Sequence, residues 1–206
     1  MSAFSLSQAL AWIKAAAQSI DANAAHLSEL DAAIGDGDHG ANMARGMAAV
    51  TKKIDSAPPA DLAALFKSVG MTLLSSVGGA SGPLYGGFFL ELGKQSAGKT
   101  ELDAAGLAAV LGAGLGDIRR RGKAEPGDKT MVDALIPAID ALAAASDLAQ
   151  GTAKAAETAR AAATATAPML ARKGRASYLG ERSIGHQDPG ANSVALLFAA
   201  LAQACA

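Results

Sequence analysis

The sequence predicts an all-α fold, with eight helices packed as an antiparallel bundle in one domain that spans residues 1–206. Hydrophobic residues make up 50% of the chain but aromatic residues only 4%, so small and aliphatic side chains must build the core. Alanine, the best helix former, is abundant among them. Apolar residues also recur at steps of three and four, which is the spacing of one helical face. A chain of 206 residues is long enough to bury one sizeable core.

The predicted helices follow this spacing and most of them have a recognisable start. Pro59 precedes the third helix, and Ser81 is placed to cap the fourth. Asp128 or Thr130 caps the sixth, and Asp188 caps the eighth. The first helix has a break before residue 27. The eight ranges are residues 5–31, 40–54, 60–77, 81–92, 102–121, 130–142, 150–172 and 189–204.

Loops rich in glycine and charge precede the second, fourth, sixth and eighth helices. Short connections imply that neighbouring helices are antiparallel, and alternate helices then begin at the same end of the bundle. The four loops should therefore meet there and form one site. They comprise residues 31–42, 75–87, 122–130 and 173–190.

The first loop carries three carboxylates among glycines, at Asp31, Asp36 and Asp38. Carboxylates this close together repel one another unless a cation binds between them. Oxygen ligands without cysteine or paired histidine favour Mg²⁺ over Zn²⁺ as that cation. An EF-hand is excluded, because neither possible loop frame ends in the bidentate glutamate that it requires. The alternative is ordinary turn chemistry, with Asp38 capping the next helix. His39 is expected to be a hydrogen-bonding or capping residue.

The other loops suit phosphate, although each has a structural alternative. The glycine-rich start of the helix at Ser81 would expose unpaired N–H groups to an anion, or form a close-packed turn. Lys129 could meet a phosphate or lie on the surface. Residues 173–190 form a long polar loop that is either functional or mobile. Basic groups in and beside it could bind phosphate oxygens: Arg172, Lys173, Arg175 and Arg182.

Net charge, cysteine content and apolar runs indicate which partners and which cellular location to expect. A net charge of −1 gives no reason to expect nucleic acid or an anionic membrane as partner. The single cysteine, Cys205, cannot form an internal disulfide. The first residues lack the basic stretch of a signal peptide, and the apolar runs are shorter than a membrane span. A cytoplasmic protein is therefore expected.

Together these motifs resemble the ADP-binding L subunit of dihydroxyacetone kinase, the DhaL family. The matching blocks cover all four loops, namely residues 30–46, 71–89, 121–133 and 171–192. The resemblance implies an eight-helix antiparallel barrel with a nucleotide, ADP or ATP, at one end. It further implies that Asp31, Asp36 and Asp38 bind two Mg²⁺ ions, and that no general base comes from this chain. The residues that would surround the nucleotide are His39, Gly40, Asn42, Ala80, Ser81, Gly122, Met131, Arg175, Asp188 and Gly190.

The resemblance also implies a reaction and two partners. A phosphoryl group would pass from the Mg-bound nucleotide to dihydroxyacetone, held on a histidine of a separate K subunit. In the phosphotransferase-system branch, a phosphohistidine on an M subunit rephosphorylates ADP in place, and a free-standing L chain favours this branch. The alternatives are an ATP-dependent kinase for another small ketose or a fatty acid, and a nucleotide-loaded regulatory module.

Overall fold

The computed structural model describes residues 3–206, and the regular secondary structure in that range is almost entirely helical. A short 3₁₀ helix, η1 (Arg175–Ser183), precedes the last α-helix. Two short strands, β1 (Phe4–Ser5) and β2 (Glu101–Leu102), pair antiparallel. The α-helices are α1 (Leu6–Ala22), α2 (Ala24–Ile34), α3 (His39–Ser56), α4 (Leu62–Ser76), α5 (Ser81–Gln95), α6 (Ala104–Gly122), α7 (Met131–Ala143), α8 (Leu148–Ala165) and α9 (Pro189–Cys205).

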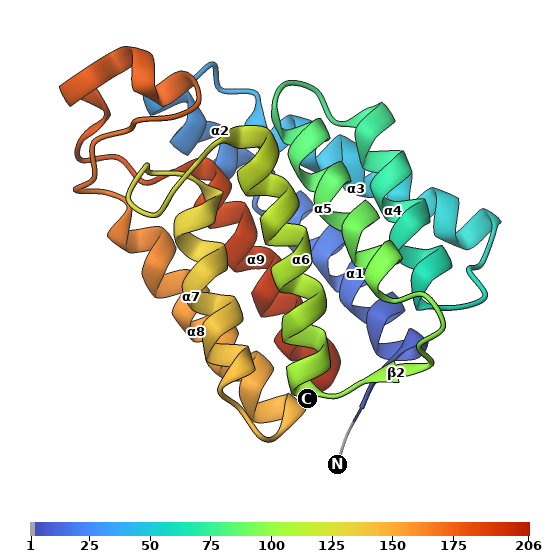
Figure 1. Cartoon of the computed structure of the whole chain (residues 1–206). Coiled ribbons are helices and arrows are strands. Elements are labelled where there is room, and N and C mark those ends of the chain that lie inside the picture. The colour runs from blue at the N-terminus through green and yellow to red at the C-terminus, as the bar shows by residue number, and fades with distance from the viewer. Residues whose placement is uncertain (1–2) are drawn as a thin grey trace.

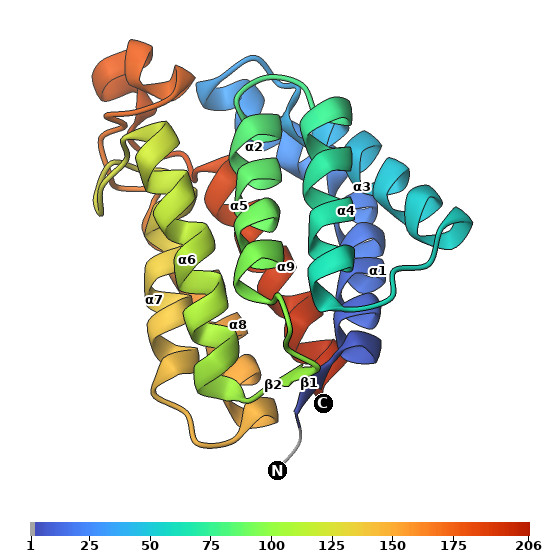
Figure 2. The ribbon, with the colours of Figure 1, turned by 45° about the vertical axis from the view of Figure 1, so that its right-hand side comes forward.

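Eight of these helices form a closed ring. Packing runs from α1 to α3, then through α4, α5, α6, α7 and α8 to α9, which packs back against α1. Neighbours in the ring are antiparallel, and α2 lies outside it against α3 (Figure 1). A second view shows that the β1–β2 pair lies at the end that carries both termini, opposite η1 (Figure 2). The predicted eight-helix antiparallel barrel is therefore confirmed, with α2 as an addition.

Some helix boundaries differ from those predicted. The first predicted helix is divided at Asn23, whose backbone leaves the helical conformation and whose side chain donates to the Ser19 carbonyl at 2.8 Å. The seventh ends at Ala165 rather than residue 172, before Pro168. Both differences matter for function. The break at Asn23 lets α2 leave the direction of α1 and pack against α3. The end of α8 at Ala165 leaves a long segment outside the ring before α9 begins.

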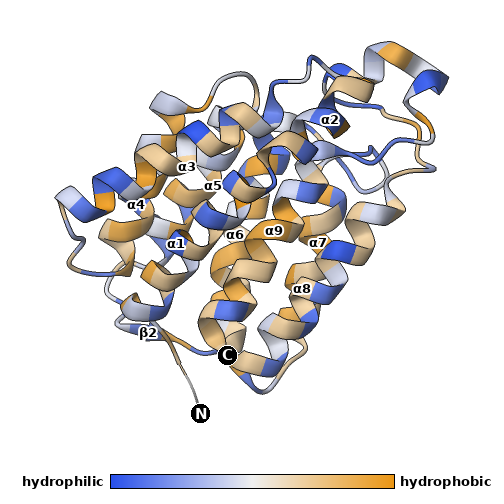
Figure 3. Ribbon diagram, turned by 180° about the vertical axis from the view of Figure 1, so that it is seen from behind, coloured by the Kyte–Doolittle hydropathy of each residue, from blue (hydrophilic) through white to orange (hydrophobic). Residues whose placement is uncertain are grey.

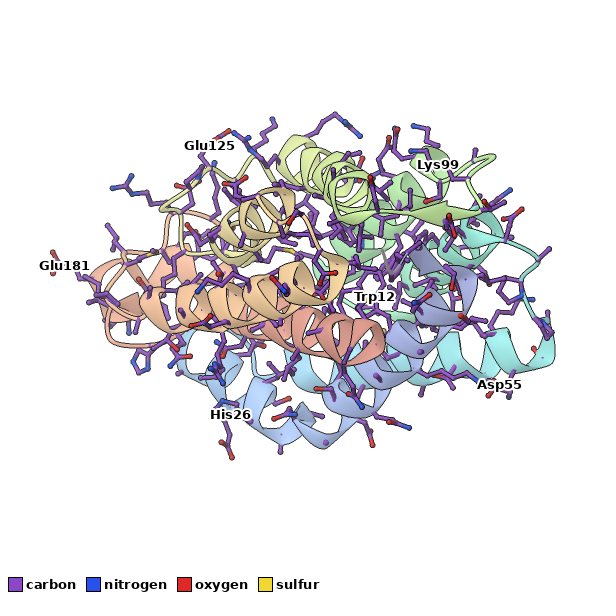
Figure 4. All side chains as sticks on the ribbon, turned by 90° about the horizontal axis from the view of Figure 1, so that it is seen from below. Trp12, His26, Asp55, Lys99, Glu125 and Glu181 are labelled. Atoms are coloured by element: carbon purple, nitrogen blue, oxygen red, sulfur yellow. The ribbon has the colours of Figure 1, made fainter. Side chains whose placement is uncertain are left out.

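The aromatic residues gather in the core around Trp12. Seen from below, Trp12 lies inside the ring of helices, whereas charged residues such as Asp55 and Lys99 lie at its edge (Figure 4). Its ring is 6.1 Å from that of Phe66 and 5.8 Å from that of Phe89, between centroids. Its Nε1 donates to the Leu197 carbonyl at 2.9 Å, which satisfies the one polar group of the side chain. Trp12 therefore ties α1 to α4, α5 and α9.

Small residues let the other helices approach. A Cβ on Gly70 would lie 2.7 Å from the Gly86 carbonyl oxygen, so α4 and α5 are in contact through their backbones. Apolar residues extend along most of α9, which packs between α1 and α8 (Figure 3). Within residues 3–206, even so, no helix combines the length and apolar character needed to cross a membrane.

Candidate functional site

A cavity of about 330 Å³ lies at the end of the barrel where α3, α5, α7 and α9 begin. Residues of all four predicted loops line it, so the prediction that the loops meet at one end is confirmed. Its size falls within the range of small-molecule sites, about 300–1,000 Å³. The loops reach it at the upper end in Figure 1, beside η1.

Asp31 organises the acidic side of the cavity. It lies in the last turn of α2 and is buried, as expected for a residue that precedes the turn at Gly35. Its Oδ2 accepts hydrogen bonds from the backbone N–H groups of Asp38 (2.9 Å) and His39 (3.1 Å). Asp31 therefore caps the start of α3. The alternative that Asp38 caps this helix is wrong, because its side chain accepts no capping hydrogen bond.

The structure brings the three predicted carboxylates together. Asp31, Asp36 and Asp38 each offer an oxygen, and these oxygens lie within 4.8 Å of one another. A Cβ on Gly35 would lie 2.2 Å from Oδ1 of Asp31, so only glycine leaves this carboxylate its place. Asp36 and Asp38 are exposed to solvent. A set of hard oxygen donors that shares one small volume fits Mg²⁺.

His39 is a buried hydrogen-bonding residue, in agreement with its expected role. Its Nδ1 lies 3.2 Å from Oγ of Ser81, and its Nε2 lies 2.9 Å from Oγ of Ser193. Burial lowers the pKa of His39, although the charges of Asp31 and Asp38 act in the opposite direction. Both ring nitrogens are therefore engaged within the fold.

The start of α5 forms the second wall. Ser81 is the first residue of this helix rather than its cap, a position that Ala80 occupies. Gly79 has a φ of +63°, which glycine adopts without strain and which turns the chain into the helix. The first N–H groups of α5 have no partner within the helix and lie beside the cavity, where an anion could bind them.

The third and fourth walls come from the starts of α7 and α9 and from the end of α6. Gly122 and Met131 line the cavity, as do Asp188 and Gly190. Asp188 caps α9 as predicted, because its Oδ2 accepts from the Ala191 N–H at 2.7 Å. Burial raises the pKa of Asp188 to about 7. This carboxyl group is therefore close to half-ionised at neutral pH.

Basic residues meet the acidic loop from the η1 segment. Arg175 lies 3.0 Å from Oδ2 of Asp36, and Lys173 also lines the cavity. Arg172 and Arg182, the other basic residues considered for phosphate, do not line it. An arginine that can leave an aspartate for a phosphate oxygen suits a site in which metal and nucleotide arrive together.

Three residues considered for nucleotide or phosphate, Gly40, Asn42 and Lys129, make contacts within the fold. Gly40 and Asn42 do not line the cavity. Gly40 is instead where α3 touches α2, since its Cβ would lie 1.9 Å from the Ala24 carbonyl oxygen. Lys129 lines the cavity but is buried, and its Nζ donates to three backbone carbonyls.

Sequence reasoning also missed the apolar part of the cavity. Helical apolar residues that line a cavity have the same spacing as core residues, so no sequence signal marks them. In the sequence, Tyr85 also cannot be told apart from a core residue. Its hydroxyl nevertheless lies 2.7 Å from Oγ of Ser193, the same oxygen that lies near Nε2 of His39. The apolar and aromatic residues found here are Ile34, Leu84, Tyr85, Ile118, Ala124, Val132, Ala176 and Pro189.

Comparison with known proteins places this site in a family. The model of the DAK2 domain matches residues 33–203, which include three of the four loops in full and the first loop from residue 33 onward. The chain belongs to the DAK2 domain family. In this DAK2 domain Asp36, Asp38 and the starts of α5, α7 and α9 fall within the matched range, and Asp31 lies two residues before it.

Relatives match over nearly the whole DAK2 domain. The "PEP-dependent dihydroxyacetone kinase 1, ADP-binding subunit DhaL" of Listeria innocua is 50% identical, covering 95% of this chain and 94% of the relative. The "L-erythrulose 1-kinase" of Mycolicibacterium smegmatis is 40% identical, covering 88% of this chain but 32% of that longer protein. A crystal structure of the dihydroxyacetone kinase from C. freundii in complex with AMP-PNP and Mg²⁺ has a TM-score of 0.76 and 29% identity. The match to this crystal structure covers 96% of the present chain and 33% of the C. freundii chain.

Proposed function

We propose that this chain is the ADP-binding subunit of a dihydroxyacetone kinase of the phosphoenolpyruvate-dependent type. One observation carries the proposal: three aspartate oxygens within 4.8 Å of one another stand at a cavity walled by the starts of four helices. The names of relatives that share up to 50% of its residues support the same activity. The cavity would hold ADP, which gains and then donates a phosphoryl group.

Different residues of the site would bind the metal ions, the phosphates and the purine base. Asp31, Asp36 and Asp38 would hold two Mg²⁺ ions, which would supply positive charge to offset the charge on the transferring group. Asp31 is suited to hold them, because two N–H groups fix its carboxylate. Ser81 and the first amides of α5 would orient phosphate oxygens, while Arg175 would neutralise charge. Met131 offers a polarizable apolar surface to a purine ring.

This chain supplies no general base in the proposed reaction. Both nitrogens of His39 have hydroxyl partners, and burial lowers the pKa of the ring. Phosphoryl transfer needs chiefly positioning and charge stabilisation, which the site described above can provide. The proton of the acceptor hydroxyl would leave toward the subunit that holds the acceptor.

Two partner subunits complete the proposal, a K subunit that holds dihydroxyacetone and an M subunit that carries a phosphohistidine. The end of the barrel that bears the cavity has the surface for such contacts. The exposed large hydrophobic residues among residues 3–206 all lie on the second half of α4 or between α8 and α9, elements that lead into the cavity. They are Met71, Leu74, Leu170, Tyr178 and Ile184.

Mass spectrometry after gel filtration tests the proposal directly. The gently purified chain should retain ADP with Mg²⁺ present and lose it in EDTA. Mixed with the K subunit, dihydroxyacetone and an M subunit that already carries its phosphohistidine, it should then form dihydroxyacetone phosphate. Product from L-erythrulose alone would instead identify a different ketose as acceptor, and a chain that binds no nucleotide would refute the proposal.

The variant Asp36→Asn tests the metal assignment. It removes one anionic oxygen from the cluster, so ADP retention at a fixed, low Mg²⁺ concentration should fall and return at higher Mg²⁺. Asp21→Asn is the matched control, because Asp21 is an exposed aspartate in α1, outside the cavity. Equal Mg²⁺ titrations for Asp36→Asn and the unmodified chain would remove Asp36 from the metal site.

A further inference from the structure

Lys129 is a buried ammonium group whose hydrogen-bond partners are backbone carbonyls. The residue is 1% exposed and precedes Thr130, the cap of α7. Its Nζ donates to the carbonyls of Ala167 (3.2 Å), Met169 (3.1 Å) and Ser183 (2.6 Å). An ammonium group has three protons, so these bonds use its whole capacity. The charge is therefore committed to the fold rather than to a ligand.

All three carbonyls belong to the segment between α8 and α9. Ala167 and Met169 lie where this segment leaves α8, and Ser183 lies where it returns after η1. Two further hydrogen bonds join the same two limbs, from Gly185 N–H to the Ala167 carbonyl at 2.8 Å and from Ala171 N–H to Oγ of Ser183 at 3.0 Å. Lys129 thus closes the neck of a loop and ties it to the start of α7.

The tip of this loop carries Arg175, which reaches Asp36 in the acidic cluster. The side chain of Arg175 is 67% exposed, so its own packing does little to fix it. Apolar support for the loop is small, a cluster of Ile34, Ala171 and Ala176 with Leu179 packed against it. The place of Arg175 therefore depends on how firmly the neck is held.

We propose that Lys129 is a positioning residue that holds Arg175 over the metal and nucleotide site by clamping the neck of the loop at residues 167–185. This inference rests on the proposed nucleotide-binding function for its effect on ligand, but the clamp itself is a property of the fold. Loss of the clamp should speed release of the nucleotide, because the loop that covers the cavity would open more often.

A double-mutant cycle on the full chain tests this mechanism. The dissociation rate of fluorescently labelled ADP is measured with Mg²⁺ for Lys129→Met, Arg175→Ala and the double variant. Each single change should raise the rate at least about threefold, and the double variant should match Arg175→Ala. Lys52→Met, a change at an exposed lysine of α3, is the control and should leave the rate unchanged. If Lys129 acted only on the stability of the fold, Lys129→Met would raise the dissociation rate by the same factor with and without Arg175.

Hydrogen–deuterium exchange supplies a readout that needs no ligand. The amides of Ala171 and Gly185 should exchange faster in Lys129→Met, while those in the middle of α1 keep their protection. If Lys129→Met does not fold, Lys129→Arg retains charge and donors with a different geometry, and should show the same pattern more weakly.

Three results would overturn the inference. They are unchanged exchange at the neck, an unchanged dissociation rate in a folded variant, and equal increases with and without Arg175. Failure of the unmodified chain to bind ADP would instead refute the proposed function, and the exchange experiment would still test the clamp.

Discussion

Asp188 gives the most detailed prediction, a pH-dependent change in stability. Burial is the main cause that raises its pKa from 3.8 to about 7, and the charges of Asp133 and Asp31 act in the same direction. The hydrogen bond from Ala191 and the charge of Lys129 act in the opposite direction without cancelling it. Between these two pKa values, the folded chain keeps a proton that the unfolded chain releases. The contribution of Asp188 to the free energy of unfolding should therefore fall as pH rises from about 4 to 7, and then level off.

The size of this effect follows from the shift. A change from 3.8 to about 7 is roughly 3 pH units, which corresponds to about 4 kcal/mol at 1.36 kcal/mol per unit. Asp188 is partly exposed at the cavity, so water there reduces the penalty. We therefore expect about 2–4 kcal/mol. Asp188→Asn should remove this dependence, because asparagine caps a helix equally well but does not ionise.

Urea denaturation of the metal-free chain measures the prediction. The free energy of unfolding of Asp188→Asn, relative to the unmodified chain, should rise by about 2–4 kcal/mol between pH 4.5 and pH 8. Asp61→Asn is the matched control, because Asp61 is an exposed helix cap that accepts from the Ala64 N–H at 2.7 Å. A constant difference across this range for Asp188→Asn would refute the reasoning. Added Mg²⁺ should shrink the difference, because it offsets the charge of Asp31.

Two further changes test the packing around the site. Gly40→Ala should lower the free energy of unfolding by at least about 2 kcal/mol, because its Cβ would overlap the Ala24 carbonyl and push α2 away. Gly112→Ala in α6 meets open space and should raise it by about 0.5–1 kcal/mol, so equal effects in thermal melts would contradict this account. Tyr85→Phe loses the hydrogen bond to Ser193 and should cost about 1 kcal/mol in urea unfolding, whereas unchanged stability would show that this bond contributes nothing.

Much of the fold was predictable because its signals are local. Apolar spacing located the helices, and Asp188 with Pro189 marked the start of α9 correctly. The division at Asn23 was placed only approximately, since an asparagine can lie within a helix or end one. The short β1–β2 pair was missed, because each strand has two residues and gains its partner from far along the chain.

The acidic part of the site was predictable from the sequence. Asp31, Asp36 and Asp38 lie within eight residues of one another, among glycines that let the chain turn back. Gly40, which the resemblance placed beside the nucleotide, packs against α2. The apolar residues that line the cavity have no sequence pattern that distinguishes them from core residues.

The all-α class, the positions of the glycine-rich loops and the acidic cluster are local properties of the sequence, since capping, turns and helical spacing act over a few residues. The folded chain was needed to show that α9 closes the ring against α1, that Asp31 caps α3, and that Lys129 holds the loop of Arg175. For the ring closure and for Lys129, the reason is separation along the chain, whereas the cap of α3 depends on how the loop after Asp31 turns back. Lys129 and Ser183 are 54 residues apart, and no local pattern specifies which distant carbonyl a buried ammonium group will meet.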